Sequence, residues 1–122
     1  MNQVGEIILK CDHLTEKLVM LYKELESRKQ YDISEQLIEC IAGLAININE
    51  CCEIGFGEEY QEKLKKACMD AREVKNMLSF LSLYGIMRPD AEVCMREISD
   101  LIVQLSTIQN NHIQKLEIES HV

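Results

Sequence analysis

The stretch DISEQLIECIAGLAININECCEI, residues 32–54, decides the fold of this chain. Its apolar residues recur at steps of three and four, which places them on one side of a helix and does not match the strict alternation of a half-buried strand. Asp32 stands three residues before Glu35, a spacing close to a capping box, in which two side chains bond free amides of the first turn. We therefore predict a helix over 32–54 with a buried stripe of Ile33, Leu37, Ile41, Leu44, Ile48 and Cys51.

The same period appears on both sides of this stretch, in segments 4–26, 58–84 and 89–116. Their stripes are Ile7, Cys11, Leu14, Leu18, Leu21 and Leu25, then Tyr60, Leu64, Ala67, Ala71, Val74, Leu78 and Leu81, then Cys94, Ile98, Leu101, Leu105 and Ile108. The connections are short, so consecutive helices should be antiparallel neighbours. The prediction is an all-α protein, an antiparallel up-down-up-down four-helix bundle in a single domain over 1–122.

Turn residues stand where these helices are predicted to end. Gly55 and Gly57 follow the second helix and Gly85 follows the third, because glycine readily adopts the left-handed conformation of a helix C-terminus. Pro89 suits the first turn of the fourth helix, since its missing amide would have no partner there. Beyond Asn110 the apolar pattern loosens, and we expect a frayed tail.

Composition narrows the class of protein. The chain has 122 residues, 47% of them hydrophobic, with only 5 Gly and 1 Pro, which favours a few long helices over many short strands. No apolar run approaches the roughly 18 to 20 residues that span a bilayer. The first ten residues carry Glu6 and have no signal-like cleavage site. We expect a cytoplasmic protein without a membrane partner.

The residues that carry enzyme chemistry do not form a recognisable constellation. Most of the six cysteines lie among apolar helix residues, so we interpret them as reduced, small core residues in preference to metal ligands or nucleophiles. Cys51 and Cys52 are adjacent and lack the CxxC spacing of a zinc site. No Glu-x-x-His pair and no glycine-rich phosphate loop occurs. The sequence predicts no enzyme, with no catalytic residue, no metal ligand and no cofactor.

The net charge of −8 is unevenly distributed. Residues 32–56 carry five acids and no base, whereas bases concentrate on the third helix at Lys63, Lys65, Lys66, Arg72 and Lys75. The favoured interpretation of these bases is a solvated helix face that pairs with acids four residues away, such as Glu62 with Lys66. The alternative is a stripe that binds the phosphates of RNA or DNA, which the overall acidity confines to this helix.

The second helix has more apolar surface than one bundle needs. Ile38, Ala42, Ala45 and Ile46 lie beside its main stripe, so this helix is either central in the bundle or also faces another subunit, and an apolar patch of this kind favours self-association. Asn47, Asn49 and Glu50 interrupt the apolar pattern; they either face solvent or hydrogen-bond across a subunit interface and fix its register, which an Asn49→Leu variant would test. The predicted homo-oligomer interface is Ile38, Ala42, Ala45, Ile46 and Asn49.

The segments GLAININECCEIGFGEEYQEKLKKACMDAREVKNMLSFLSLYGIM and REISDLIVQLSTI together resemble a bacterial four-helix bundle family. One branch of that family is encoded by intervening sequences in large-subunit ribosomal RNA genes. The other is the accessory variability determinant of diversity-generating retroelements. The resemblance covers about residues 33–108 and rests on the Asn- and Glu-bearing second helix, on Gly55 and Gly57, on the stretch 67–73 and on the Glu97-Ile98 step.

This resemblance implies a homo-oligomer, a pentameric ring in members of the family, and no catalytic residues. In the retroelement branch it also implies a reverse transcriptase and its template RNA as partners. The retroelement branch is basic, with arginines on the third helix, whereas residues 76–87 here contain no base. We therefore expect a non-enzymatic assembly or adaptor protein. The alternatives are a nucleic-acid-binding module that uses the third-helix bases, or a member of the ribosomal branch.

Overall fold

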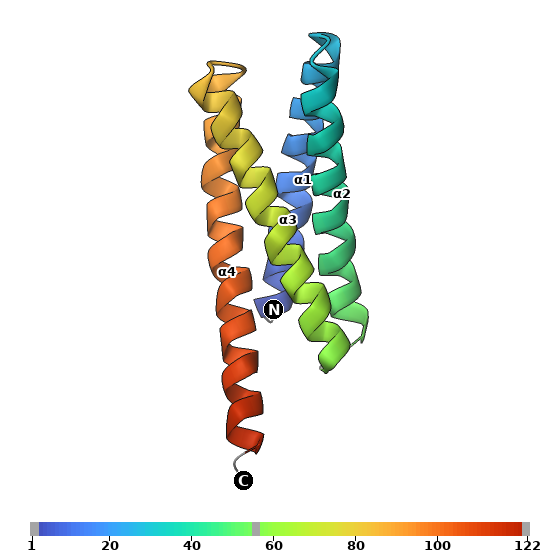
Figure 1. Ribbon diagram of the computed structural model, residues 1–122, viewed down its shortest axis with the longest axis vertical. Helices are drawn as coiled ribbons and strands as arrows, with labels where there is room; N and C mark the ends of the chain where they lie inside the picture. Colours follow the sequence, from blue (N-terminus) through green and yellow to red (C-terminus); the bar gives the residue numbers. More distant parts are fainter. Residues whose placement is uncertain (1–2, 55–56, 121–122) are drawn as a thin grey trace.

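The computed structural model describes residues 3–54 and 57–120, with side chains described for 5–51, 53–54 and 57–111 (Figure 1). The described ranges contain four helices and no strand. The helices are α1 (Gln3–Ser27), α2 (Tyr31–Ile54), α3 (Glu58–Leu83) and α4 (Arg88–Ser120). The all-α, four-helix prediction is therefore confirmed.

The helices form a ring of contacts. α2 packs against α1 and α3, and α4 packs against α3 and α1. The α1–α2 and α3–α4 connections lie at one end of the molecule and the α2–α3 connection lies at the other (Figure 1). α3 runs diagonally from the side of α2 to the side of α4, so the α1–α2 pair and the α3–α4 pair separate toward the end that holds two connections. We call this the open end.

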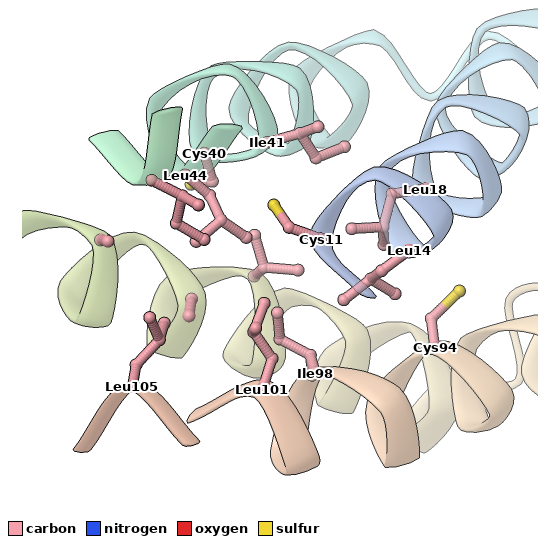
Figure 2. Packing of buried hydrophobic residues seen from close by; sticks show 14 of the residues in the cluster. Cys11, Leu14, Leu18, Cys40, Ile41, Leu44, Cys94, Ile98, Leu101 and Leu105 are labelled. Atoms are coloured by element: carbon pink, nitrogen blue, oxygen red, sulfur yellow. The ribbon is translucent and has the colours of Figure 1, made fainter. Parts of the chain in front are cut away.

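One hydrophobic core joins the four helices. Figure 2 shows Leu14 and Leu18 of α1, Leu44 of α2, and Ile98 and Leu101 of α4 pointing into the same interior. Burying an aliphatic side chain of this size contributes about 1.5–3 kcal/mol, so these contacts dominate the stability of the bundle. The predicted stripes are confirmed as buried, except that Ile33 and Ile108 are half-buried. The core also contains Ser34, Cys40, Cys68 and Ala91, which lie outside those stripes.

The start of α2 differs from the prediction. The amide of Ser34 donates to the carbonyl of Gln30 over 3.0 Å, so Gln30 precedes the helix and Tyr31 begins it. Asp32 therefore lies inside the first turn, where the positive end of the helix dipole stabilises its carboxylate. The capping-box prediction, which needs Asp32 to precede the helix, is wrong. At the other end of the chain, the backbone of α4 remains helical to Ser120, past the predicted end at residue 116.

The chain turns at the open end in two similar ways. Gly85 has φ 71°, and the amide of Ile86 donates to the carbonyl of Leu81 over 2.8 Å, as in a Schellman motif. The predicted stop at Gly85 is thus confirmed. α1 ends with the same bond pattern, but the left-handed residue is Lys29, with φ 62°. The predicted Gly55 turn lies outside the described residues.

Candidate interaction surfaces

Polar side chains of α2 bond directly to α3. The side-chain amide of Asn47 donates to Oδ2 of Asp70 over 3.0 Å. A Cβ placed on Gly43 would lie only 2.7 Å from the same oxygen, so the Asp70 carboxylate packs against bare helix backbone. Burial raises the pKa of Asp70; the hydrogen bond from Asn47 lowers it, and the nearby charge of Glu73 raises it further. This arrangement fixes the register of α2 on α3 within one chain.

Two further contacts extend this polar seam. Cys40 donates its thiol hydrogen to Oε2 of Glu73 over 3.2 Å. Burial, followed by the bond to Glu73, raises the pKa of Cys40 to about 12, so the thiol stays protonated at neutral pH. Nζ of Lys63 lies 2.5 Å from a carboxylate oxygen of Glu50, and this bond raises the pKa of Lys63. The seam therefore joins the helices by hydrogen bonds and an ion pair and has no nucleophilic thiolate.

The polar residues of α2 thus divide into two groups. Asn47 and Glu50 are partly buried and bond to α3, whereas Asn49 is exposed. Of these three residues, only Asn49 is exposed, and the contacts of Asn47 and Glu50 with α3 of the same chain were not predicted from the sequence.

The predicted oligomer residues are only partly accessible. Ala42, Ile46 and Asn49 are exposed, and Ile46 keeps 55% of its surface in contact with solvent. Ile38 and Ala45 are half-buried, and Ile38 packs against the core. The exposed side of α2, which we call the α2 outer face, comprises Glu35, Glu39, Ala42, Ile46, Asn49 and Glu53.

The five predicted bases do not share one face of α3. Lys63 points to α2, where it pairs with Glu50, and Nη2 of Arg72 lies 3.5 Å from Oγ of Ser106 on α4. These two positions are about 180° apart around a helix that turns roughly 100° per residue. Lys65, Lys66 and Arg72 are exposed and Lys75 is half-buried. We call the exposed group Glu62, Lys65, Lys66, Met69, Arg72 and Glu73 the α3 outer face.

The cysteines with described side chains belong to the interior. Cys11, Cys40, Cys51, Cys68 and Cys94 are buried, as the sequence predicts, and none of them forms a disulfide; the Cys52 side chain lies outside the described part. Burial raises the pKa of Cys11, Cys68 and Cys94, the last to about 11. Among the described side chains, no group of three or more His, Cys, Asp or Glu residues could hold a metal ion. Over the described helices, none is long and apolar enough to cross a membrane.

The open end has features that the periodicity did not reveal. A groove of about 530 Å³ lies between α1 and α4, and its lining includes Met20, Met87 and Val93. A second groove of about 360 Å³ lies between α2 and α3, lined by Ile33, Gln36, Asn76, Met77 and Phe80. The rings of Phe80 and Tyr84 lie 4.7 Å apart, although both side chains are largely exposed. Apolar residues outside the core stripes, such as Met20, are the sequence signal that would have identified this region.

Comparisons of the chain with protein-family models, with curated proteins and with solved structures find no match. The surfaces described above are an acidic face with an apolar centre on α2, a face of mixed charge with three bases around Met69 on α3, and grooves at the open end that are lined in part by apolar residues.

Proposed function

We propose that this chain is a non-enzymatic, homo-oligomeric assembly protein that uses its helical bundle to present surfaces to protein partners. In this proposal the helices are antiparallel in up-down-up-down order. The alternation of the connections between the two ends of the molecule supports that order (Figure 1). The buried, protonated thiols agree with a role in packing and not in chemistry.

The α2 outer face carries the proposal. Ile46 is 55% exposed and stands beside the exposed Ala42, between Glu39 and Glu53. An apolar centre with a polar rim is the arrangement found at protein interfaces. Single exposed apolar residues are common, so the argument rests on the grouping of Ala42 and Ile46 at the middle of one face.

The resemblance to the family with ribosomal and retroelement branches supports a closed ring, with five subunits as in members of that family. In the retroelement branch the partners would be a reverse transcriptase and its template RNA. The acidic charge of α2 and α4 favours a protein partner over nucleic acid for most of the surface. We place the protein in the cytoplasm.

Light scattering coupled to size-exclusion chromatography tests the assembly. At micromolar concentration we expect a single defined oligomer for the unmodified chain, and a lower mass for Ile46→Glu. Val103→Glu is the matched control, because Val103 is similarly exposed, at 64%, on the outer side of α4. A monomeric unmodified chain would contradict the proposal. Asn49→Leu tests the register role separately, since an unchanged oligomer would remove Asn49 from that role.

Nucleic acid binding is the second candidate, and one observation favours it. Lys65 and Lys66 are exposed, and within the described ranges neither forms an ion pair. Phosphate binding by these lysines would give an affinity for RNA that falls steeply as salt increases and that is lost in Lys65→Glu/Lys66→Glu. Fluorescence anisotropy with a labelled RNA at low salt decides this, and no detectable binding there rejects it.

A further inference from the structure

The α2 and α3 outer faces have opposite charge and lie side by side. α2 carries acids and no base, and Glu39 and Glu53 have no ion-pair partner within the described part of the chain. On α3, the exposed Met69 has Lys65, Lys66, Arg72 and Glu73 one helical turn away and Glu62 two turns away, so three exposed bases and two exposed acids surround it. Each face therefore has an apolar centre with charged neighbours, of negative sign on α2 and mainly positive sign on α3.

The apolar centres of the two faces lie at the same height. Asn47 of α2 bonds to Asp70 of α3. Ile46 precedes Asn47 and Met69 precedes Asp70 in the chain. Ile46 is 55% exposed and Met69 is 53% exposed. A second molecule that approaches the α2–α3 side would meet both apolar centres together.

Charge limits how two copies can meet on this side. Two α2 outer faces would repel each other, because acids would oppose acids. The segment 89–122, which contains most of α4, has six acids and two bases, so α4 gives α2 no better partner. Residues 1–31 and α3 each have five acids and five bases, so α3 is distinguished by the local grouping of its bases and not by its total charge. The mainly basic cluster around an exposed apolar side chain is on α3.

We propose that the α2 outer face of one copy packs on the α3 outer face of a second copy, with Ile46 against Met69 and with Glu39 and Glu53 beside Lys65, Lys66 and Arg72. This inference rests on the proposed homo-oligomer and names the surfaces that would form it. The apolar contact supplies affinity, while the ion pairs set the orientation and exclude contact between two α2 faces.

Charge reversal tests the pairing. One variant carries Glu39→Lys and Glu53→Lys, and the other carries Lys65→Glu and Lys66→Glu. Each variant alone places like charges across the interface. We expect its apparent Kd for assembly to rise at least about tenfold, and a tenfold rise corresponds to a loss of about 1.4 kcal/mol in the free energy of association. Combining all four changes in one chain restores opposite charges at every contact and should restore the mass measured by light scattering. Mixing the two variants restores opposite charges at contacts between unlike chains, which leaves at least one like-charged contact in a ring of five, and should raise the mass above that of either variant alone.

The control variant is Glu16→Lys/Asp100→Lys, which makes the same charge change at exposed sites on α1 and α4 and should assemble as the unmodified chain does. Circular dichroism establishes that each variant is helical. If one of the two charge-reversal variants does not fold, the chain with all four changes and the cross-linking experiment still test the pairing. In the cross-linking experiment, a short thiol cross-linker should join Ile46→Cys chains to Met69→Cys chains more efficiently than either variant to itself.

The outcomes separate the two proposals. If the unmodified chain is monomeric, both fail. If it is oligomeric but charge reversal leaves its mass unchanged, or if mixing gives no recovery and Ile46→Cys chains cross-link mainly to one another, this pairing is wrong while the homo-oligomer stands.

Discussion

The α2–α3 and α1–α4 contacts join neighbouring helices in different ways. At α2–α3, Gly43 allows the Asp70 carboxylate to reach the helix backbone, and hydrogen bonds and an ion pair cross the seam. At α1–α4, the exposed pair Lys17–Glu97 crosses beside a groove of about 530 Å³. α1 also packs less extensively on α4 than α3 does on either neighbour. The bundle is therefore held mainly through α3, and α1 is its least constrained helix.

The largest difference in the free energy of unfolding should appear between alanine substitutions at Leu44 of α2 and at Met20 in the α1–α4 groove. Leu44→Ala removes a fully buried side chain of α2 and should lower the free energy of unfolding by about 2–5 kcal/mol. Met20→Ala, in the α1–α4 groove where Met20 is 67% exposed, should change it by less than about 0.5 kcal/mol. Urea denaturation at one protein concentration measures both, and comparable losses would show that the two regions are equally packed.

Adding a methyl group at the close approach should have an intermediate effect whose sign depends on the neighbour. Gly43→Ala displaces the Asp70 carboxylate from Asn47, and we expect a net loss of about 1 kcal/mol in spite of the better helix propensity of alanine. In an Asp70→Ala background the same change should stabilise the helix by up to about 1 kcal/mol. Denaturation of the four chains completes this cycle. Equal effects in both backgrounds would remove the steric role of Asp70.

A smaller effect should appear in the pH dependence of the α2–α3 seam. Burial raises the pKa of Asp70 above its ordinary value of 3.8, so the folded state binds a proton more tightly than the unfolded state. Stability from this group is full below pH 3.8 and is lost as the pH rises through the raised pKa. The melting temperature of Asp70→Asn should therefore rise relative to that of the unmodified chain as the pH increases from 3 to neutrality. A difference that stays constant or shrinks would contradict this.

The smallest effect should come from the polar contact at α1–α4. Lys17→Ala breaks the pair with Glu97, and because both side chains are substantially exposed we expect a loss of about 0.5 kcal/mol or less, reduced further by added salt. Lys23→Ala, an exposed α1 lysine outside this pair, is the matched control in the same denaturation series. A salt-insensitive loss above about 1.5 kcal/mol would mean that α1 is held to α4 more firmly than its packing indicates.

Periodicity predicted what repeats along the helices. The stripes from Ile7 to Leu25 and from Tyr60 to Leu81 are buried because every third or fourth residue of a helix returns to the same side. Gly85 was identifiable as a turn because its side chain is absent, whereas Lys29 adopts a similar conformation without any such signal. The capping box failed because helix ends depend on single hydrogen bonds that periodicity does not describe.

The candidate surfaces were predictable only in part. An excess of apolar residues on α2 located its outer face, but the sequence did not distinguish the exposed Ile46 from the half-buried Ile38, since that depends on how far α1 covers α2. Spacing likewise suggested one basic stripe, while the position of α3 between two neighbours directs Lys63 and Arg72 to opposite sides. The open-end grooves are lined by residues of different helices, and the relative placement of helices leaves no local mark in the sequence.

The left-handed conformation of Lys29 bears on where the native bundle begins to unfold. A non-glycine residue in the left-handed region costs about 1–2 kcal/mol, so Lys29 strains the corner between α1 and α2, as Met87, with φ 48°, strains the corner between α3 and α4. The α1–α2 corner lies at the open end and follows α1, which packs less extensively on its neighbours than the other three helices do. Fraying of the native bundle should therefore start there and detach α1 first, leaving α2, α3 and α4 as the residual three-helix unit.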